Sequence, residues 1–163
     1  MDKQKKTSSL RKLILDISIP SLYLIPLLAV YFSHPDPKTF GFHSDPVVYA
    51  GLGLGMAGLI IWILSMWNLG GSLAVLPGAD RLVTRGLYKH IRHPIYLGIT
   101  LTLFGLMLAV GSLWGILYVL FIVIPVNIVR ARLEDKKLLA QFGETYKAYC
   151  EKTRSWIPIP KDK

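Results

Sequence analysis

The sequence predicts an all-α integral membrane protein with four transmembrane helices, and two observations support this prediction. Hydrophobic residues make up 52% of the 163 positions, and the mean hydropathy is +0.44. They gather in segments long enough to cross a bilayer, which takes about 17–25 mainly apolar residues. The segments between these spans are alternately rich and poor in basic residues. At this length we expect a single membrane domain, residues 1–163.

The last two predicted spans are separated only by Gly111 and Ser112, so we expect them to form an antiparallel hairpin. Beyond the hairpin, apolar residues recur every three or four positions among charged ones. This pattern predicts an amphipathic helix, which Gly143 interrupts. The predicted spans cover about residues 13–32, 47–67, 94–110 and 113–129, followed by a cytoplasmic C-terminal helix and tail over residues 130–163.

The second span contains a formal GxGxxG pattern at Gly53, Gly55 and Gly58. A dinucleotide-binding loop would need a preceding strand and a βαβ unit, and the surrounding sequence predicts neither. Gly51 and Gly55 also form a GxxxG pair, which lets membrane helices pack closely. We therefore interpret these glycines as a helix-packing face.

The distribution of Lys and Arg predicts the orientation in the membrane. The N-terminal segment carries five of these residues, the loop 33–46 one, the loop 68–93 four, the turn 111–112 none, and the segment from Arg130 onward nine. Basic segments of membrane proteins lie on the cytoplasmic side. We therefore expect a multi-pass protein with both termini in the cytoplasm. No cleavable signal peptide is expected, because the first apolar segment is too long and lacks a small-residue cleavage site.

The net charge of +9 would suggest nucleic acid as a partner of a soluble protein, but here the basic residues flank membrane spans. We therefore expect this charge to face membrane lipids and not nucleic acid. The sequence indicates no obligate protein partner. The single cysteine, Cys150, excludes an internal disulfide and a multi-cysteine metal site. His34 and His43 lack the acid–His spacing of a metal centre, so no metal is predicted.

Two polar segments flank the predicted hairpin, residues 80–96 before it and residues 127–149 after it. The hairpin brings both to one membrane face, where ionisable groups are functional candidates. Arg130 and Glu134 are one helical turn apart and share a face there. An ordinary charge cluster at the end of a span would have the same spacing. A helix cap and an interfacial aromatic belt are likewise the structural interpretations of His93, Tyr88 and Tyr96.

The order of the motifs favours a function over these structural interpretations. Two strings, GLYKHIRHPIYLG and, beyond the hairpin, RARLEDKKLLAQFGETYKAYCEKTRSWIP, carry a resemblance. They resemble the isoprenylcysteine carboxyl methyltransferase and phospholipid methyltransferase superfamily of integral membrane enzymes. The resemblance covers about residues 70–160. Its elements are Tyr88, Arg92–Tyr96, Gly98, the acidic pair Glu134-Asp135, Phe142-Gly143, Tyr146 and Tyr149.

The resemblance implies S-adenosylmethionine as methyl donor, in a cytoplasmic cofactor site formed by the loop before the hairpin and the helix after it. It implies catalytic roles for Arg130 and Glu134, with Arg130 binding the acceptor. Two positions depart from the family pattern: Asp135 stands where a second glutamate is usual, and Leu87 where a proline is usual. The implied donor contacts are Asp80, Arg81, Leu82, Val83, Tyr88, His93, Pro94, Ile95, Tyr96 and Glu134.

The chemistry of the donor agrees with these residue types. A carboxylate such as Glu134 suits its amino group or ribose hydroxyls, and His93 suits its carboxylate. A carboxylate acceptor needs no general base, only Arg130 to hold it. An amine acceptor must arrive deprotonated, and a guanidinium is badly placed beside it. The favoured function is therefore methyl transfer to the carboxylate of a lipid-like or prenylated acceptor that enters from the bilayer.

Three alternatives remain. The first is a phospholipid amine or a thiol as the methyl acceptor. The second is an NADPH-dependent enzyme like the sterol reductases, whose C-terminal helical pattern is similar, although the short chain and the acidic pair disfavour it. The third is a non-catalytic membrane scaffold that associates through its GxxxG face, which leaves the ordered polar motif unexplained.

Overall fold

The structure is a computed structural model that describes residues 23–25, 28, 44–69 and 82–155. Within these ranges the regular elements are all helices, and the one β-contact is an isolated bridge between Ile91 and Arg154. The all-α prediction is therefore confirmed for this part of the chain. Most of the first predicted span lies outside the described residues.

The second and third predicted spans are confirmed as helices α2 (Asp45–Leu69) and α3 (Pro94–Val110). Pro94 occupies the first turn of α3, where its missing N–H breaks no hydrogen bond. Gly111 ends α3 with φ +72°, a left-handed conformation that glycine adopts without a steric penalty. Between α2 and α3, the short 3₁₀ helix η2 (Gly86–Lys89) lies in the basic loop.

Glycines allow α2 and α3 to pack with their backbones in contact. A Cβ atom at Gly105 of α3 would lie 2.3 Å from the backbone nitrogen of Gly55, and one at Gly51 would lie 2.5 Å from that of Ala109. Gly58 makes the same kind of close approach to Thr102. Gly53 faces open space, with nothing within 4 Å of its ideal Cβ. The GxxxG face is therefore the contact with α3, and the formal GxGxxG pattern has no strand–helix context.

The third and fourth predicted spans form the expected hairpin, because only Gly111 and Ser112 separate α3 from α4 (Leu113–Tyr118). The Ser112 hydroxyl accepts a hydrogen bond from the backbone N–H of Gly115 and caps the new helix. The helix continues through a π-helical turn, η3 (Val119–Val123), into α5 (Ile124–Phe142). The π turn lies just before Pro125, whose missing N–H disturbs the α-helical hydrogen bonding of the preceding turn.

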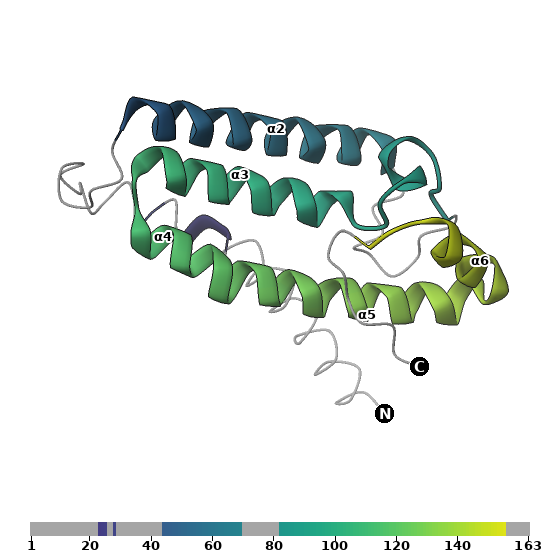
Figure 1. The fold of residues 1–163 in the computed structure, drawn as a ribbon. Helices are drawn as coiled ribbons and strands as arrows, with labels where there is room; N and C mark the ends of the chain where they lie inside the picture. Colours follow the sequence, from purple (N-terminus) through teal and green to yellow (C-terminus); the bar gives the residue numbers. More distant parts are fainter. Residues whose placement is uncertain (1–22, 26–27, 29–43, 70–81, 156–163) are drawn as a thin grey trace, which may run out of the picture.

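The chain reverses at Gly143, which has φ +52°, and forms α6 (Glu144–Lys152). Figure 1 shows α6 lying back over the end of α5, towards the loop that precedes α3. Backbone hydrogen bonds join the two segments: Arg92 donates to the Arg154 carbonyl at 3.0 Å, and Arg154 donates to the His90 carbonyl at 3.2 Å. The C-terminal helix thus holds the basic loop against the bundle.

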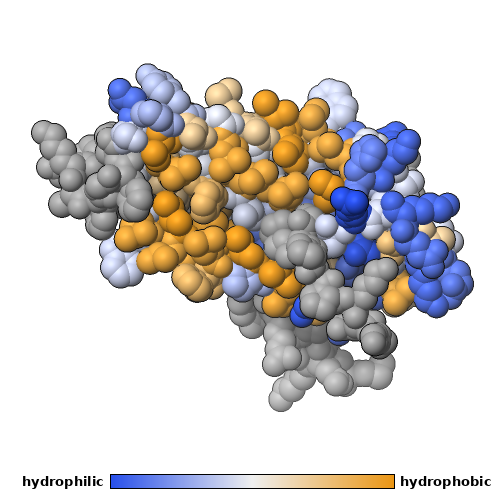
Figure 2. Space-filling model, in the orientation of Figure 1, coloured by the Kyte–Doolittle hydropathy of each residue, from blue (hydrophilic) through white to orange (hydrophobic). Residues whose placement is uncertain are grey.

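Helix α2 and the continuous helix Leu113–Phe142 are long and apolar enough to cross a membrane, and α3 is a shorter apolar helix of 17 residues. Only 11% of the most apolar window of α2 is buried inside the protein, and only 22% of that of Leu113–Phe142. Figure 2 shows the hydrophobic residues spread over much of this face, with hydrophilic residues gathered mainly at the end where α6 lies. Apolar surface of this extent suits lipid better than water. The four-span count and the cytoplasmic termini remain predictions.

The predicted topology is testable by cysteine labelling. We expect Lys38→Cys, in a Cys150→Ser background, to react with a membrane-impermeant thiol reagent from outside the cell. The physical reason is the low count of basic residues in the loop 33–46. Reaction of Lys38→Cys only after the cytoplasmic side is opened would show the orientation to be wrong.

The α2–α3 contact predicts opposite effects for two glycine substitutions. Gly105→Ala places a methyl group against the α2 backbone, and overpacking of this kind costs about 1–3 kcal/mol. The matched control, Gly53→Ala, meets no atom and gains helix propensity of up to about 1 kcal/mol. Thermal unfolding in detergent should therefore separate the two variants, and equal midpoints would contradict this packing.

Candidate functional site

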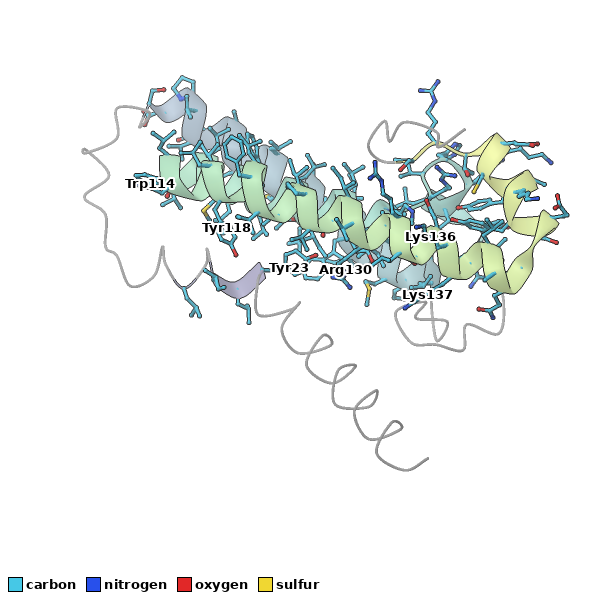
Figure 3. All side chains as sticks on the ribbon, turned by 90° about the horizontal axis from the view of Figure 1, so that it is seen from below. Tyr23, Trp114, Tyr118, Arg130, Lys136 and Lys137 are labelled. Atoms are coloured by element: carbon cyan, nitrogen blue, oxygen red, sulfur yellow. The ribbon has the colours of Figure 1, made fainter. Side chains whose placement is uncertain are left out.

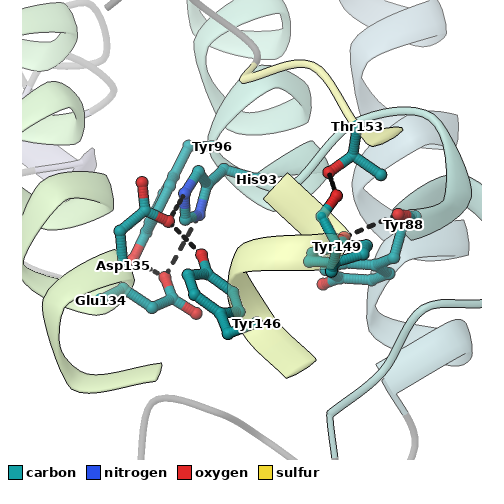
Figure 4. A network of polar contacts seen from close by, with 8 residues as sticks. All are labelled: Tyr88, His93, Tyr96, Glu134, Asp135, Tyr146, Tyr149 and Thr153. Atoms are coloured by element: carbon teal, nitrogen blue, oxygen red, sulfur yellow. Dashed lines mark hydrogen bonds and ion pairs between the residues drawn. The ribbon is translucent and has the colours of Figure 1, made fainter. Parts of the chain in front are cut away.

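A cluster of polar side chains lies where the loop before α3 meets α5 (Figure 4). The loop contributes His93, the residue that precedes the first turn of α3, and α5 contributes Glu134 and Asp135. The tight Gly111-Ser112 turn makes α3 and the α4–α5 helix antiparallel neighbours, so these residues meet although they are about 40 positions apart in sequence.

His93 is buried, with 3% of its surface exposed, and both of its ring nitrogens face carboxylates. Nε2 lies 2.8 Å from Oδ1 of Asp135, a hydrogen-bond distance, and Nδ1 lies 3.5 Å from Oε2 of Glu134. A neutral imidazole carries only one N–H, whereas an imidazolium donates from both nitrogens. The arrangement therefore favours the charged form of His93.

The pKa directions agree with this geometry. Burial of His93 lowers its pKa, but the hydrogen bonds and charges of Asp135 and Glu134 outweigh burial and raise the pKa to about 9. Burial of Asp135 raises its pKa, but the hydrogen bond from His93 outweighs burial and holds the pKa below its ordinary value. At neutral pH, His93 and Asp135 therefore form an ion pair in which His93 is buried and Asp135 is partly exposed.

Tyr96 extends the cluster along α3. Its hydroxyl donates to Oε2 of Glu134 at 3.1 Å, and its ring stacks on that of His93 with a centroid distance of 5.7 Å. The guanidinium carbon of Arg130 lies 5.2 Å from the centroid of the Tyr96 ring, a cation–π contact. Tyr96 thus joins the acidic pair to Arg130. The side chain of Glu134 keeps 24% of its surface exposed, so its carboxylate is held in place and still reachable.

Helix α6 supports the cluster from the other side. The buried Tyr146 hydroxyl donates to Oδ1 of Asp135, and burial followed by this bond raises the pKa of Tyr146. The Tyr149 hydroxyl donates to the backbone carbonyl of Tyr88 at 2.6 Å, and burial raises the pKa of Tyr149 to about 12. Each tyrosine therefore remains a neutral donor at neutral pH and ties α6 to one part of the site.

A second polar chain leads from Arg130 into the apolar part of the bundle. Nη1 of Arg130 donates to the Tyr23 hydroxyl at 3.2 Å, and that hydroxyl donates to Oδ1 of Asn127. Nδ2 of Asn127 in turn donates to Oγ1 of Thr100 on α3 at 3.1 Å. Figure 3 shows Tyr23 and Arg130 next to each other beside α5. Residue 23, from the first apolar segment of the chain, therefore contacts the helix that carries the acidic pair.

The structure brings together four of the residues that the sequence indicated: His93, Tyr96, Arg130 and Glu134. Tyr88 and Pro94 are buried beside them. Leu82, Val83 and Ile95 are partly buried, whereas Asp80 and Arg81 lie outside the described residues.

Two of the predicted site residues have partners within the protein itself. The sequence suggested His93 as a partner for the donor's carboxylate, but both ring nitrogens are engaged by Asp135 and Glu134. Arg130 and Glu134 share a helix face, but the ion pairs of the described residues do not include one between them, and Arg130 contacts Tyr23 and Tyr96 instead. Within the same residues, no group of three His, Cys, Asp or Glu is placed to hold a metal ion.

Sequence reasoning did not assign site roles to Tyr23, Thr100, Asp135 and Tyr146. Thr100 carried a signal, because it is a polar residue within an apolar span, and such residues need a partner. Asp135 and Tyr146 also carried a signal, because both belong to the ordered motif on which the resemblance rests. Tyr23 carried no signal, because its partner is 107 residues away in the sequence.

Similar proteins identify the family of this chain. The sequence pattern of the family described as Phospholipid methyltransferase matches residues 46–145. The chain belongs to the phospholipid methyltransferase family. A matching relative is the Protein-S-isoprenylcysteine O-methyltransferase of Schizosaccharomyces pombe, 31% identical over 78 residues, which are 48% of this chain and 33% of that protein. The matched part thus spans about a third of the relative's length. No solved structure matches the chain significantly.

The ion pair of His93 and Asp135 predicts a pH dependence of stability. His93 has a raised pKa in the folded state, so its contribution is fully present below pH 6.5 and is lost as the pH rises through about 9. Asp135 has a lowered pKa, so its contribution is present above pH 3.8 and is lost as the pH falls through its folded-state pKa.

Thermal unfolding in detergent between pH 6 and pH 10 checks the alkaline limb. The wild-type midpoint should fall more steeply towards pH 10 than that of His93→Gln, which has no charge to lose at this site. Asp135→Asn should flatten the curve in the same way. Parallel pH curves for the wild type and both variants would contradict a charged His93.

Proposed function

We propose that this family member transfers a methyl group from S-adenosylmethionine to a lipid-like acceptor at the cytoplasmic face of the membrane. The observation that carries the proposal is a cluster of motif residues around the partly exposed carboxylate of Glu134. The other members of this cluster are His93, Tyr96 and Arg130. When bound, the donor supplies a methyl group on a positively charged sulfur.

The residues present fit such a donor. Glu134 is oriented by Tyr96 and His93 and remains partly exposed, which suits an amino group or ribose hydroxyls. Partly buried Leu82 and Val83 offer apolar surface for a base. Methyl transfer needs alignment of three atoms and exclusion of water, so a rigid site is the main requirement.

Arg130 supports a carboxylate as the acceptor group. The Tyr96 ring covers the face of its guanidinium, and the Tyr23 hydroxyl accepts a hydrogen bond from one of its N–H groups. The planar arrangement of guanidinium donors matches the two oxygens of a carboxylate. An ionised carboxylate is already nucleophilic and needs no base. The relative from Schizosaccharomyces pombe is named for O-methyl transfer to isoprenylcysteine, which agrees with this acceptor class.

A phospholipid amine is the second candidate, because the family is named for phospholipid methylation. An amine or a thiol must lose a proton before it attacks the methyl group. His93, the histidine of the cluster, is cationic at neutral pH and does not serve as a base. The cluster therefore suits a carboxylate better than an amine or a thiol. A nicotinamide-dependent reductase or a scaffold finds no support in the family match.

Donor binding tests the proposal directly. Glu134→Gln should weaken the binding of S-adenosylmethionine by about tenfold or more, because a hydrogen bond to a charged group contributes about 1.5–3 kcal/mol. Isothermal titration of the detergent-solubilised protein measures the affinity. Glu144→Gln is the matched control, since the Glu144 side chain is 85% exposed on α6. Equal donor affinity of a folded Glu134→Gln variant and the wild type would exclude this role.

A further inference from the structure

Asn127 is a polar side chain buried where a polar group is costly. None of its surface is exposed, and it lies in the predicted fourth span, one turn before Arg130. In a membrane span an unpaired amide costs several kcal/mol, so such a residue must be hydrogen-bonded and is a functional candidate. Simple helix packing would be served better by an apolar residue of similar size.

The hydrogen bonds of Asn127 fix its orientation. The amide nitrogen donates to Thr100 of α3, so the amide oxygen points away from α3 and accepts the proton of the Tyr23 hydroxyl. With its only proton used in this way, the Tyr23 oxygen presents lone pairs to Arg130. An arginine side chain has hydrogen-bond donors and no acceptor, so the Tyr23 oxygen must act as the acceptor in its contact with Arg130. The order Thr100, Asn127, Tyr23, Arg130 is thus a directed chain.

The chain ends on a guanidinium that is held from two directions. Tyr23 accepts one N–H at the edge of the group, and the Tyr96 ring covers its face at 5.2 Å. A guanidinium has five N–H donors, and among the described residues the hydrogen bond to Tyr23 uses one of them. Long side chains lose much rotamer freedom when they are fixed, and fixing one before the ligand arrives improves binding.

We propose that Tyr23 and Asn127 are positioning residues, which hold the Arg130 guanidinium in the orientation that binds the acceptor's carboxylate. The proposal rests on the proposed function and extends it to the first apolar segment. Thr100 anchors the chain on α3, the helix that also carries Tyr96, so the acceptor side and the donor side of the site share one rigid helix. Tyr23 then contributes to acceptor binding through Arg130.

Tyr23→Phe is the central test, because it removes one hydroxyl and keeps the ring. The assay follows labelled S-adenosylmethionine with two acceptor probes: N-acetyl-S-farnesylcysteine, which has a free carboxylate, and vesicles of phosphatidylethanolamine. With the farnesylated probe, we expect kcat/KM to fall about tenfold or more, mainly through the acceptor's KM, while donor affinity changes less than twofold. Tyr49→Phe is the matched control, since Tyr49 is 71% exposed on α2.

Two further comparisons separate positioning from a general loss of structure. Thr100→Ser keeps the hydroxyl that accepts from Asn127 and should retain acceptor binding, whereas Thr100→Val should lose it. In an Arg130→Lys background, Tyr23→Phe should cost little more, because the fork that it positions is already absent. Additive losses of Tyr23→Phe and Arg130→Lys, or equal KM values for Tyr23→Phe and the wild type, would overturn the proposal.

These outcomes differ from a failure of the proposed function. If the wild type binds no S-adenosylmethionine, or methylates neither probe, the methyl-transfer function itself is refuted, and the positioning role falls with it. If the wild type methylates the farnesylated probe and Tyr23→Phe does so equally well, only the positioning role is refuted. Methylation of phosphatidylethanolamine alone would refute the carboxylate acceptor and, with it, this role for Tyr23.

Discussion

The contact of His93 with Asp135 and Glu134 is the interaction on which the rest of the site depends. It joins the first turn of α3 to the middle of α5, and Tyr96, Arg130 and Tyr146 are arranged around it. The charge of His93 is taken out of water, which is costly, and the two carboxylates compensate for this cost through short contacts. Removing the carboxylates would leave the charge of His93 buried without a partner, whereas Asp135 and Glu134 themselves remain 25% and 24% exposed. The site is therefore rigid only while the whole cluster is present.

The residues of this cluster meet because one face of the helix from α4 to α5 packs along α3. Val119, Val123, Asn127 and Ala131 are spaced by four and are fully buried. A regular α-helix has 3.6 residues per turn. Every fourth residue is therefore rotated by about 40° around the helix axis relative to the one before it. The π-helical turn at Val119–Val123 contains one residue more than an α-helical turn, and this reverses part of that rotation. As a result, Asn127 meets Thr100 and Asp135 meets His93 along the antiparallel helix α3.

Much of this fold was predictable from the sequence, because the signals were local. Long apolar segments bounded by Gly, Pro and charged residues located α2, α3 and the helix after the hairpin to within a few residues. The glycine pattern of α2 predicted a packing face, and α3 supplies the matching glycines. The start and the end of the first predicted span cannot be compared in the same way, because they lie outside the described residues.

The site was predicted less completely, for a physical reason. His93, Tyr96 and Glu134 stood out because they belong to an ordered motif, but their mutual contacts depend on the register between two helices. The resemblance implied His93 as a donor contact, and the structure shows that its two ring nitrogens face Asp135 and Glu134. The partners of Tyr23 and Thr100 became visible only in three dimensions, since a hydroxyl in an apolar segment does not indicate which distant group it contacts.

The charge state of His93 is the most direct test of this account. The protein has four histidines, so a ¹⁵N-histidine NMR spectrum is simple, and His93→Gln assigns the relevant signals. The account predicts an imidazolium with both ring nitrogens protonated at pH 7.5, which loses its proton only near pH 9. A neutral His93 ring at pH 7.5, titrating near the ordinary value of 6.5, would contradict the ion pair on which the site depends.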